Sequence, residues 1–309
     1  MVKIAVVGYG NVGKGVIKAI TTSEDMGLVG IVTKRPGIVR EEVDYVPVVD
    51  DMNKLGNVDV AILCGSSEHV REEAKKIVSK YKVNTIDSFD IHLQIFDYKK
   101  ELSKLCEECG TTSIISAGWD PGINSVVRVL FDYSIPFVET ETKFGPGMSM
   151  GHSTAVREIS GVLDAVSITI PTDKKGVHRR EVYVATSEEA DQSLIKETIL
   201  GHEKFRSDET YVNFEPLERI RKRRLDMQHS GHIYRTNEEL GQKLEYHVAM
   251  RSNPQFTGQI MVAAARASLK MPPGAYTLVE VPPIYFSEKS VEGTWFNGKL
   301  VCGGKFQVI

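Results

Sequence analysis

Residues 3–13 of this chain read Lys3-Ile4-Ala5-Val6-Val7-Gly8-Tyr9-Gly10-Asn11-Val12-Gly13. A short run of apolar, β-forming residues ends at a glycine, and a segment with the apolar periodicity of a helix follows. The glycines form a G-x-G-x-x-G turn between the strand and the helix. Gly8 permits a tight turn, Gly10 lets backbone N–H groups approach a pyrophosphate, and Gly13 lets the helix pack closely on the strand. We therefore expect a dinucleotide at the positive N-terminus of this helix, although such turns also simply end strands.

Length and charge narrow the class of protein. At 309 residues the chain suits two domains, or one large domain with an insertion. The formal net charge is only −3, and the one dense basic run, residues 219–224, has acidic neighbours. That run is better explained as a solvated helix face or a subunit contact than as an RNA-binding site. No apolar stretch approaches eighteen residues, and residues 2–7 are too short for a signal peptide, so we expect neither a membrane span nor secretion.

The four cysteines are Cys64, Cys106, Cys109 and Cys302. Their number suggests reduced thiols in a cytoplasmic protein. Cys106 and Cys109 have the spacing of metal ligands, but no second Cys or His pair lies nearby in the sequence to complete a zinc site. They fall at the end of a helical pattern, so we interpret them as ordinary thiols and expect no metal site.

The first half of the chain alternates strands with helical patterns. Four further buried strands are expected at 28–32, 59–64, 83–87 and 112–116. Five strands that alternate with helices predict an α/β fold with a doubly wound, Rossmann-type parallel sheet. We assign residues 1–118 to this domain.

The second half of the chain has a different pattern of predicted elements. Beyond about residue 135 the sequence shows alternating strands separated by turns rich in Gly and Pro, with a helix over 155–163. We assign 119–253 to an α+β domain, and expect an open sheet with helices on one face. We expect residues 254–309 to return to the first domain.

The end of the second strand indicates which dinucleotide is bound. An NAD enzyme would place an acid about twenty residues after the glycine turn, to hold the ribose 2′-hydroxyl. Here that place reads Thr33-Lys34-Arg35-Pro36, and the first acid is Glu41. Lys34 and Arg35 would bind a 2′-phosphate through charge-assisted hydrogen bonds. The alternative is a basic surface turn, but the missing acid favours NADP.

A second turn, after the strand at 59–64, faces the same edge of the sheet. It reads Cys64-Gly65-Ser66-Ser67, and the serines fit either a helix cap or a cofactor contact. The expected cofactor-binding residues are Gly8, Tyr9, Gly10, Asn11, Val12, Gly13, Thr33, Lys34, Arg35, Cys64, Gly65, Ser66 and Ser67.

Two carboxylates follow the fourth and fifth predicted strands. Asp90 comes shortly after residue 87, and Asp120 stands before Pro121 at the start of another helical pattern. Ligands of open α/β sheets bind beyond the carboxyl ends of the strands. Beside a nicotinamide, Asp90 and Asp120 would hold an ammonium group and act as general acid or base. Asp120 fits a helix cap equally well.

With these segments in view, the chain resembles the meso-2,6-diaminopimelate dehydrogenase family over nearly its whole length. The matching segments are Gly8–Gly13, Asp87–Asp90, Gly118–Gly122, Gly145–Met148, Gly151–Ser153, Ile170–Pro171, His178–Arg180, His229–His232 and Asn253–Pro254. Several of them are far more specific than a glycine turn, and their order matches throughout.

This resemblance implies a reaction and a set of site residues. It implies a homodimer that oxidises the D-centre of meso-diaminopimelate with NADP, yielding L-2-amino-6-oxopimelate, ammonia and NADPH for lysine synthesis. It also implies that the α+β domain of residues 119–253 serves substrate binding and dimerisation. Asp90 and Asp120 would lie near the D-centre amino group. The substrate-binding residues that the family implies are Trp119, Phe144, Met150, Gly151, Thr169, Arg180, His229 and Asn253.

Two departures widen the possible substrates. Better-known members carry Gln in place of Met150 and Asp in place of Thr154, and they have an insertion before His178. The chain therefore resembles a shorter subgroup with a less polar pocket, so activity on other D-amino acids or 2-oxo acids is an alternative.

Other readings of the same architecture are a dihydrodipicolinate reductase, a homoserine dehydrogenase and a non-enzymatic NADPH-sensing regulator. This sequence has no His-His-x-x-Lys segment, which the reductase would need, and no clear candidate for the catalytic lysine of a homoserine dehydrogenase. It also shows no DNA- or partner-binding module, which a regulator would need.

Overall fold

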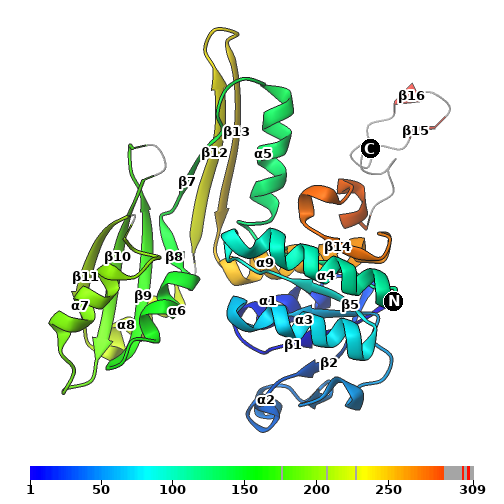
Figure 1. Ribbon diagram of the computed structural model, residues 1–309, viewed down its shortest axis with the longest axis horizontal. Helices are drawn as coiled ribbons and strands as arrows, with labels where there is room; N and C mark the ends of the chain where they lie inside the picture. The colour runs from blue at the N-terminus through cyan, green and yellow to red at the C-terminus, as the bar shows by residue number, and fades with distance from the viewer. Residues whose placement is uncertain (175–176, 207, 227, 289–300, 303–304, 307–309) are drawn as a thin grey trace. The chain divides into compact units, whose positions relative to one another are not determined.

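The chain consists of two compact units (Figure 1). The computed structural model describes residues 1–174, 177–206, 208–226, 228–288, 301–302 and 305–306. One unit comprises Met1–Val126 together with Pro254–Ile309, and the other comprises Val127–Asn253. The division falls within helix α5 (Ile123–Ser134), whereas the boundary expected from the sequence lies before it, at 118/119.

The first unit contains a seven-stranded parallel sheet in the order β14-β6-β5-β4-β1-β2-β3. The strands are β1 (Val2–Val7), β2 (Met26–Val32), β3 (Val48–Val49), β4 (Val60–Leu63), β5 (Asn84–Asp87), β6 (Thr112–Ile114) and β14 (Gly274–Tyr276). The predicted Rossmann-type sheet is confirmed, with its reversal of strand order between β1 and β4. The sequence did not predict β3 or β14, because both are very short.

Helices cover both faces of this sheet. They are α1 (Asn11–Thr21), α2 (Pro36–Glu42), α3 (Ser67–Tyr81), α4 (Ile95–Cys109) and α9 (Asn253–Ser268). Ile4 and Val6 pack with residues of α1 and α9, whereas Ala5 and Val7 pack with residues of α3 and α4. Because successive side chains of a strand point to opposite faces, the all-apolar β1 supplies two cores at once.

The second unit contains two sheets rather than the single open sheet that we expected. Its four-stranded sheet has the order β11-β10-β9-β8, and its three-stranded sheet has the order β13-β12-β7. The strands are β7 (Glu141–Phe144), β8 (Gly147–Ser149), β9 (Val162–Pro171), β10 (His178–Thr186), β11 (Glu209–Phe214), β12 (His229–Asn237) and β13 (Gln242–Met250). All pairings are antiparallel except that of β10 with β11.

The helices of this unit also differ from the expectation. They are α6 (Met150–Arg157), α7 (Gln192–Gly201) and α8 (Leu217–Leu225). Ala165 of β9 packs with α6 and α7, whereas the next residue, Val166, packs with Ile220 of α8. The helices therefore lie on both faces of the four-stranded sheet, not on one.

The helix expected over 155–163 ends early. α6 stops at Arg157 and β9 begins at Val162. Gly161, just before β9, has φ of +84°, a conformation that a helix cannot continue through and that side-chain-bearing residues rarely adopt. The apolar residues after it follow the strand's period of two instead.

The basic run at 219–224 lies on α8 and largely pairs within its own unit. Arg221 pairs with Glu218, and Arg224 with Asp164. Arg223 binds Glu215 through two nitrogens and stacks on the Tyr183 ring, 3.7 Å from its centroid. In the described ranges, no helix has the length and apolar character needed to cross a membrane.

Arg266 of α9 fastens the C-terminal segment to the first half of the chain. It is 8% exposed, and its Nε and Nη2 donate to the two Asp25 oxygens at 2.5 and 2.7 Å. The guanidinium also binds the Phe286 carbonyl oxygen (3.0 Å) and Glu288 (2.7 Å).

We predict that Arg266→Met lowers the free energy of unfolding by about 3 kcal/mol, because it strands partners of a buried charge. Urea unfolding measures this. The control is Arg221→Met, which removes an exposed ion pair and should change stability by less than about 0.5 kcal/mol. Equal effects of the two substitutions would contradict the prediction.

Candidate active site

A cavity of about 730 Å³ lies at the carboxyl ends of β1, β2 and β4 in the first unit. Eight of the thirteen expected cofactor residues line it: Gly8, Tyr9, Gly10, Thr33, Lys34, Arg35, Gly65 and Ser66. The other five belong to the same turns and to the first residues of α1 and α3, but they are not part of the cavity lining: Asn11, Val12, Gly13, Cys64 and Ser67. The volume is typical of a small-molecule site.

The glycine turn brings the N-terminus of α1 to this cavity. Gly8 has φ of +99°, and a Cβ on Gly13 would lie 2.2 Å from the Gly8 carbonyl oxygen. Gly10 precedes α1 and accepts its first backbone hydrogen bond, from Lys14 N–H at 2.9 Å. The N–H groups before Lys14 have no partner within the helix, and together with the helix dipole they form an anion site.

The end of β2 supplies positive charge. In the part of the chain that the structure describes, Lys34 and Arg35 form no ion pair. Several acids also line the cavity, but Glu42 pairs with Lys14 (2.7 Å), and Asp50 pairs with Lys54. Lys34 and Arg35 therefore remain available for a phosphate.

The two serines after β4 have different roles, since one lines the cavity and the other binds Asp90. Ser66 precedes α3 and lines the cavity, but its side chain makes no capping hydrogen bond. The Ser67 hydroxyl donates to Asp90 Oδ1 at 2.6 Å and accepts from the Asp90 N–H at 3.1 Å. Ser67 thus orients one of the two carboxylates of interest.

Asp90 and Asp120 follow the neighbouring strands β5 and β6. Asp90 is exposed and Asp120 is half-buried. A cis peptide bond joins Asp120 to Pro121, and Gly122, at φ +143°, lies so close to Gly118 that a Cβ would meet its carbonyl oxygen at 1.9 Å. This tight loop ends directly before α5.

Asp87, which was not among the predicted site residues, connects the segments that carry these two carboxylates. Its Oδ1 accepts from the N–H groups of Phe89 (2.9 Å) and Ser116 (3.1 Å), and its Oδ2 from the Tyr98 hydroxyl (2.7 Å). Its own carbonyl accepts from Ala117 N–H at 2.7 Å. The side chain is fully buried, and this burial raises the pKa of Asp87. The sequence did contain a signal for Asp87, because a charged residue at the end of a buried strand is unusual unless it has partners.

In the second unit, Arg180 and Thr169 lie opposite each other on β10 and β9. Arg180 Nη1 donates to Thr169 Oγ1 at 2.7 Å, and Arg180 Nε donates to Asp208 Oδ2 at 2.6 Å. The Arg180 and Asp208 side chains are only 11% and 9% exposed. Among the described residues, none accepts a hydrogen bond from Nη2 of Arg180. Asp208 was not predicted, because its position before β11 has no sequence signature.

Two histidines lie near this arginine. Burial, and then the Arg180 charge, lowers the pKa of His229, which is 6% exposed and donates from Nδ1 to the Ser230 carbonyl at 2.9 Å. Burial also lowers the pKa of His178, whose Nε2 accepts from Phe144 N–H at 3.1 Å. Both rings are therefore neutral near pH 7, and His178 adds a residue that the predicted set lacked.

The structure thus assigns the predicted substrate residues to separate units. Trp119, buried, lies in the first unit with Asp90 and Asp120. The second unit holds Phe144, Met150, Gly151, Thr169, Arg180, His229 and Asn253. Met150 and Gly151 form the first turn of α6, and Asn253 begins α9.

Comparison with known proteins identifies the family. The family model for the diaminopimelic acid dehydrogenase C-terminal domain matches residues 118–252. A meso-diaminopimelate D-dehydrogenase of Bacteroides fragilis is 42% identical over 289 residues, covering 92% of this chain and 94% of that protein. The chain belongs to the diaminopimelate dehydrogenase family. This membership confirms the resemblance of the motifs and replaces the reductase and homoserine dehydrogenase readings.

Solved structures agree with this family. The DAP dehydrogenase of C. glutamicum in complex with DAP has a TM-score of 0.87 and 31% identity, covering 95% of this chain and 98% of that one. An engineered D-amino acid dehydrogenase bound to NADP⁺ has a TM-score of 0.83 and 28% identity, with the same coverage.

His152 of α6 gives this family member a pH-dependent contact. Its Nε2 donates to the Lys204 carbonyl at 2.9 Å, so Nδ1 accepts from the Ser149 hydroxyl at 2.8 Å. Burial, aided by the Arg180 charge, lowers the pKa of His152 from 6.5 to about 3. The folded protein therefore keeps this ring neutral where the unfolded chain would protonate it.

We predict that the stability due to His152 is complete above pH 6.5 and is lost as the pH falls toward 3. The slope is at most about 1.4 kcal/mol per pH unit, because one proton is taken up on unfolding. Urea unfolding of wild type and His152→Gln between pH 7 and 4 measures it. Parallel pH profiles of the two proteins would rule out this role.

Proposed function

We propose that this chain catalyses the NADP-dependent oxidative deamination of the D-centre of meso-2,6-diaminopimelate. The products are L-2-amino-6-oxopimelate, ammonia and NADPH, and the reaction serves lysine biosynthesis. The observation that carries this proposal is the buried Arg180, which offers Nη2 beside Thr169 as a site for a distal carboxylate. Family membership supplies the reaction type, and Lys34 and Arg35 support NADP over NAD.

The protein's part in this reaction is orientation and electrostatics. NADP, held by the residues of the nucleotide cavity, would supply the acceptor for the hydride of the D-centre carbon. Asp90 and Asp120 hold the ammonium group of that centre, and one of them, or a water that it orients, takes the proton. Water then adds to the resulting imine carbon and ammonia leaves. Asp87 keeps the two carboxylate-bearing segments in register by binding N–H groups of both.

Asp208 sharpens the substrate class. Because its carboxylate already neutralises Arg180, the cluster has no net charge with which to attract a lone carboxylate. A substrate end that carries both a carboxylate and an ammonium group would satisfy Arg180 and Asp208 together. The distal L-centre of diaminopimelate has this composition, whereas simple dicarboxylates and simple D-amino acids do not.

A broader D-amino acid dehydrogenase is the second candidate. The less polar residues Met150 and Thr154 favour it, and Met150 packs against an apolar cluster. We also propose, on the family resemblance alone, that the enzyme is a cytoplasmic homodimer.

We predict that Asp120→Ala lowers kcat by about 10²–10⁴-fold while NADPH binding stays unchanged, because proton transfer and ammonium binding are lost. NADPH formation is followed with meso-, LL- and DD-diaminopimelate and simple D-amino acids, using NADP or NAD. The control is Asp97→Ala, an exposed acid on α4.

Near-normal turnover by Asp120→Ala would remove Asp120 from the mechanism. NADPH binding without turnover of any of these amino acids would favour the sensor reading.

We predict that Asp208→Asn lowers kcat/KM for meso-diaminopimelate by about 10–150-fold, the loss expected for a hydrogen bond to a charged group. D-2-aminopimelate, which lacks the distal ammonium, should lose less. Glu209→Gln, at an exposed neighbouring position, is the control.

Arg180→Met tests the carboxylate-binding role of Arg180 separately from Asp208. This substitution should raise KM for both substrates and favour substrates without a distal carboxylate. If Asp208→Asn affects both substrates equally, Asp208 only orients Arg180 and does not select the ammonium group.

A further inference from the structure

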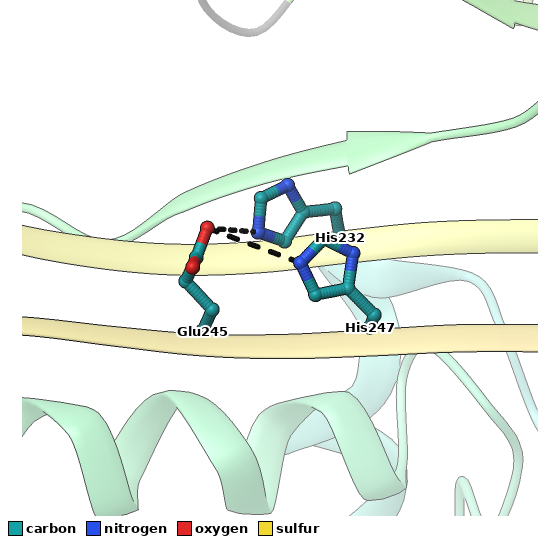
Figure 2. Close-up of side chains that lie close together, drawn as sticks. All are labelled: His232, Glu245 and His247. Atoms are coloured by element: carbon teal, nitrogen blue, oxygen red, sulfur yellow. Dashed lines mark ion pairs between the residues drawn. The ribbon is translucent and has the colours of Figure 1, made fainter.

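Three potential metal ligands gather on the hairpin of β12 and β13, outside the proposed substrate and cofactor residues. Figure 2 shows His232, Glu245 and His247 with their ring nitrogens and carboxylate turned toward one another. His232 and His247 are partners across the two antiparallel strands, and Glu245 lies two residues before His247. Since side chains alternate along a strand, all three project from one face.

The ligand atoms converge on a small volume. His232 Nε2 lies 3.2 Å from Glu245 Oε1, and His247 Nε2 lies 3.9 Å from the same oxygen. The two imidazole rings are stacked, with centroids 3.7 Å apart and planes at 18°. All three ligand atoms lie within 4.8 Å of one another, and in the described ranges this is the only group of three His, Cys, Asp or Glu residues so placed.

We propose that His232, Glu245 and His247 bind one divalent transition-metal ion of the zinc class. Zinc takes imidazole nitrogens and carboxylate oxygens at about 2.0–2.2 Å, usually in a tetrahedron. Ligand atoms in such a tetrahedron are separated by about 3.3–3.5 Å. The separations here bracket this value, so small side-chain rotations would suffice, and water would take the fourth position.

One lysine competes for the site. Lys243 Nζ lies 3.0 Å from the same Glu245 Oε1, and the Lys243 side chain is 56% exposed. Exposed ion pairs contribute little to stability. A metal ion that brings two further ligands to Glu245 would therefore displace Lys243 at small cost.

Metal binding would join β12 to β13. His232 and His247 come from different strands, so a shared ion bridges the hairpin in addition to its backbone ladder. Because an ion that binds only the folded form stabilises it by mass action, the melting temperature should rise with metal concentration.

Titration calorimetry with ZnCl₂ on the EDTA-treated full chain tests the proposal, together with the absorption spectrum of bound Co²⁺. Wild type should bind one equivalent, with tetrahedral Co²⁺ bands. His247→Asn and Glu245→Gln should each weaken Zn²⁺ binding by more than about tenfold. Loss of a residue that only hydrogen-bonds to a metal ligand already costs about that much, and loss of a ligand should cost more.

Two controls separate this site from non-specific binding. His92→Asn removes an exposed histidine elsewhere and should leave affinity and stoichiometry unchanged. Lys243→Met removes the competitor and should strengthen binding by up to about fivefold. The proposal is overturned if wild type binds no Zn²⁺, or if the substitutions at 245 and 247 leave the affinity unaltered.

Discussion

The structure of the first unit depends on the close approach of α1 to the end of β1. At this point Gly13 leaves no room for a side chain beneath the Gly8 carbonyl oxygen. The same helix meets α9 with equal closeness, since a Cβ on Gly15 would lie 2.4 Å from the Pro254 carbonyl oxygen. The helix whose N-terminus faces the cavity is therefore also the helix against which α9 packs. From α9 the chain continues to β14, which completes the sheet beside β6.

Asp87 imposes a comparable constraint two strands away. A buried carboxylate is costly unless its oxygens are hydrogen-bonded, and here three donors satisfy them. Because two of these donors are backbone N–H groups of Phe89 and Ser116, the requirement fixes the chain shortly before Asp90 and shortly before Asp120. Ser116, at φ +54°, holds a conformation uncommon for a side-chain-bearing residue. We interpret the fully buried Asp87 as what makes that backbone path tolerable.

The sequence predicted best what depends on local pattern. Five of the seven strands of the first unit, their doubly wound parallel arrangement and the turn at Gly8 follow from apolar runs and glycine spacing. The strand at Gly274–Tyr276 could not be predicted this way, because three residues carry no period and only the neighbouring β6 makes them a strand. The two-sheet division of the second unit was missed for a related reason, since it depends on the pairing of β7 with β12, which lies far along the chain. In the site, Asp208 and His178 become relevant only through their contacts with Arg180 and Phe144.

The charges of the two units suggest how one substrate with two similar ends is oriented. Both ends of diaminopimelate carry an ammonium and a carboxylate, so charge sign alone cannot distinguish them. The first unit offers Asp90 and Asp120 beyond β5 and β6, together with the nucleotide cavity. The second offers an acid that is already bound to the buried Arg180. Under the proposed function, the pair of Arg180 and Asp208 would satisfy both charges of the distal end, and Asp90 and Asp120 would bind the ammonium group of the end that is oxidised. Orientation would then follow from the position of a single arginine and of the Thr169 hydroxyl that it binds.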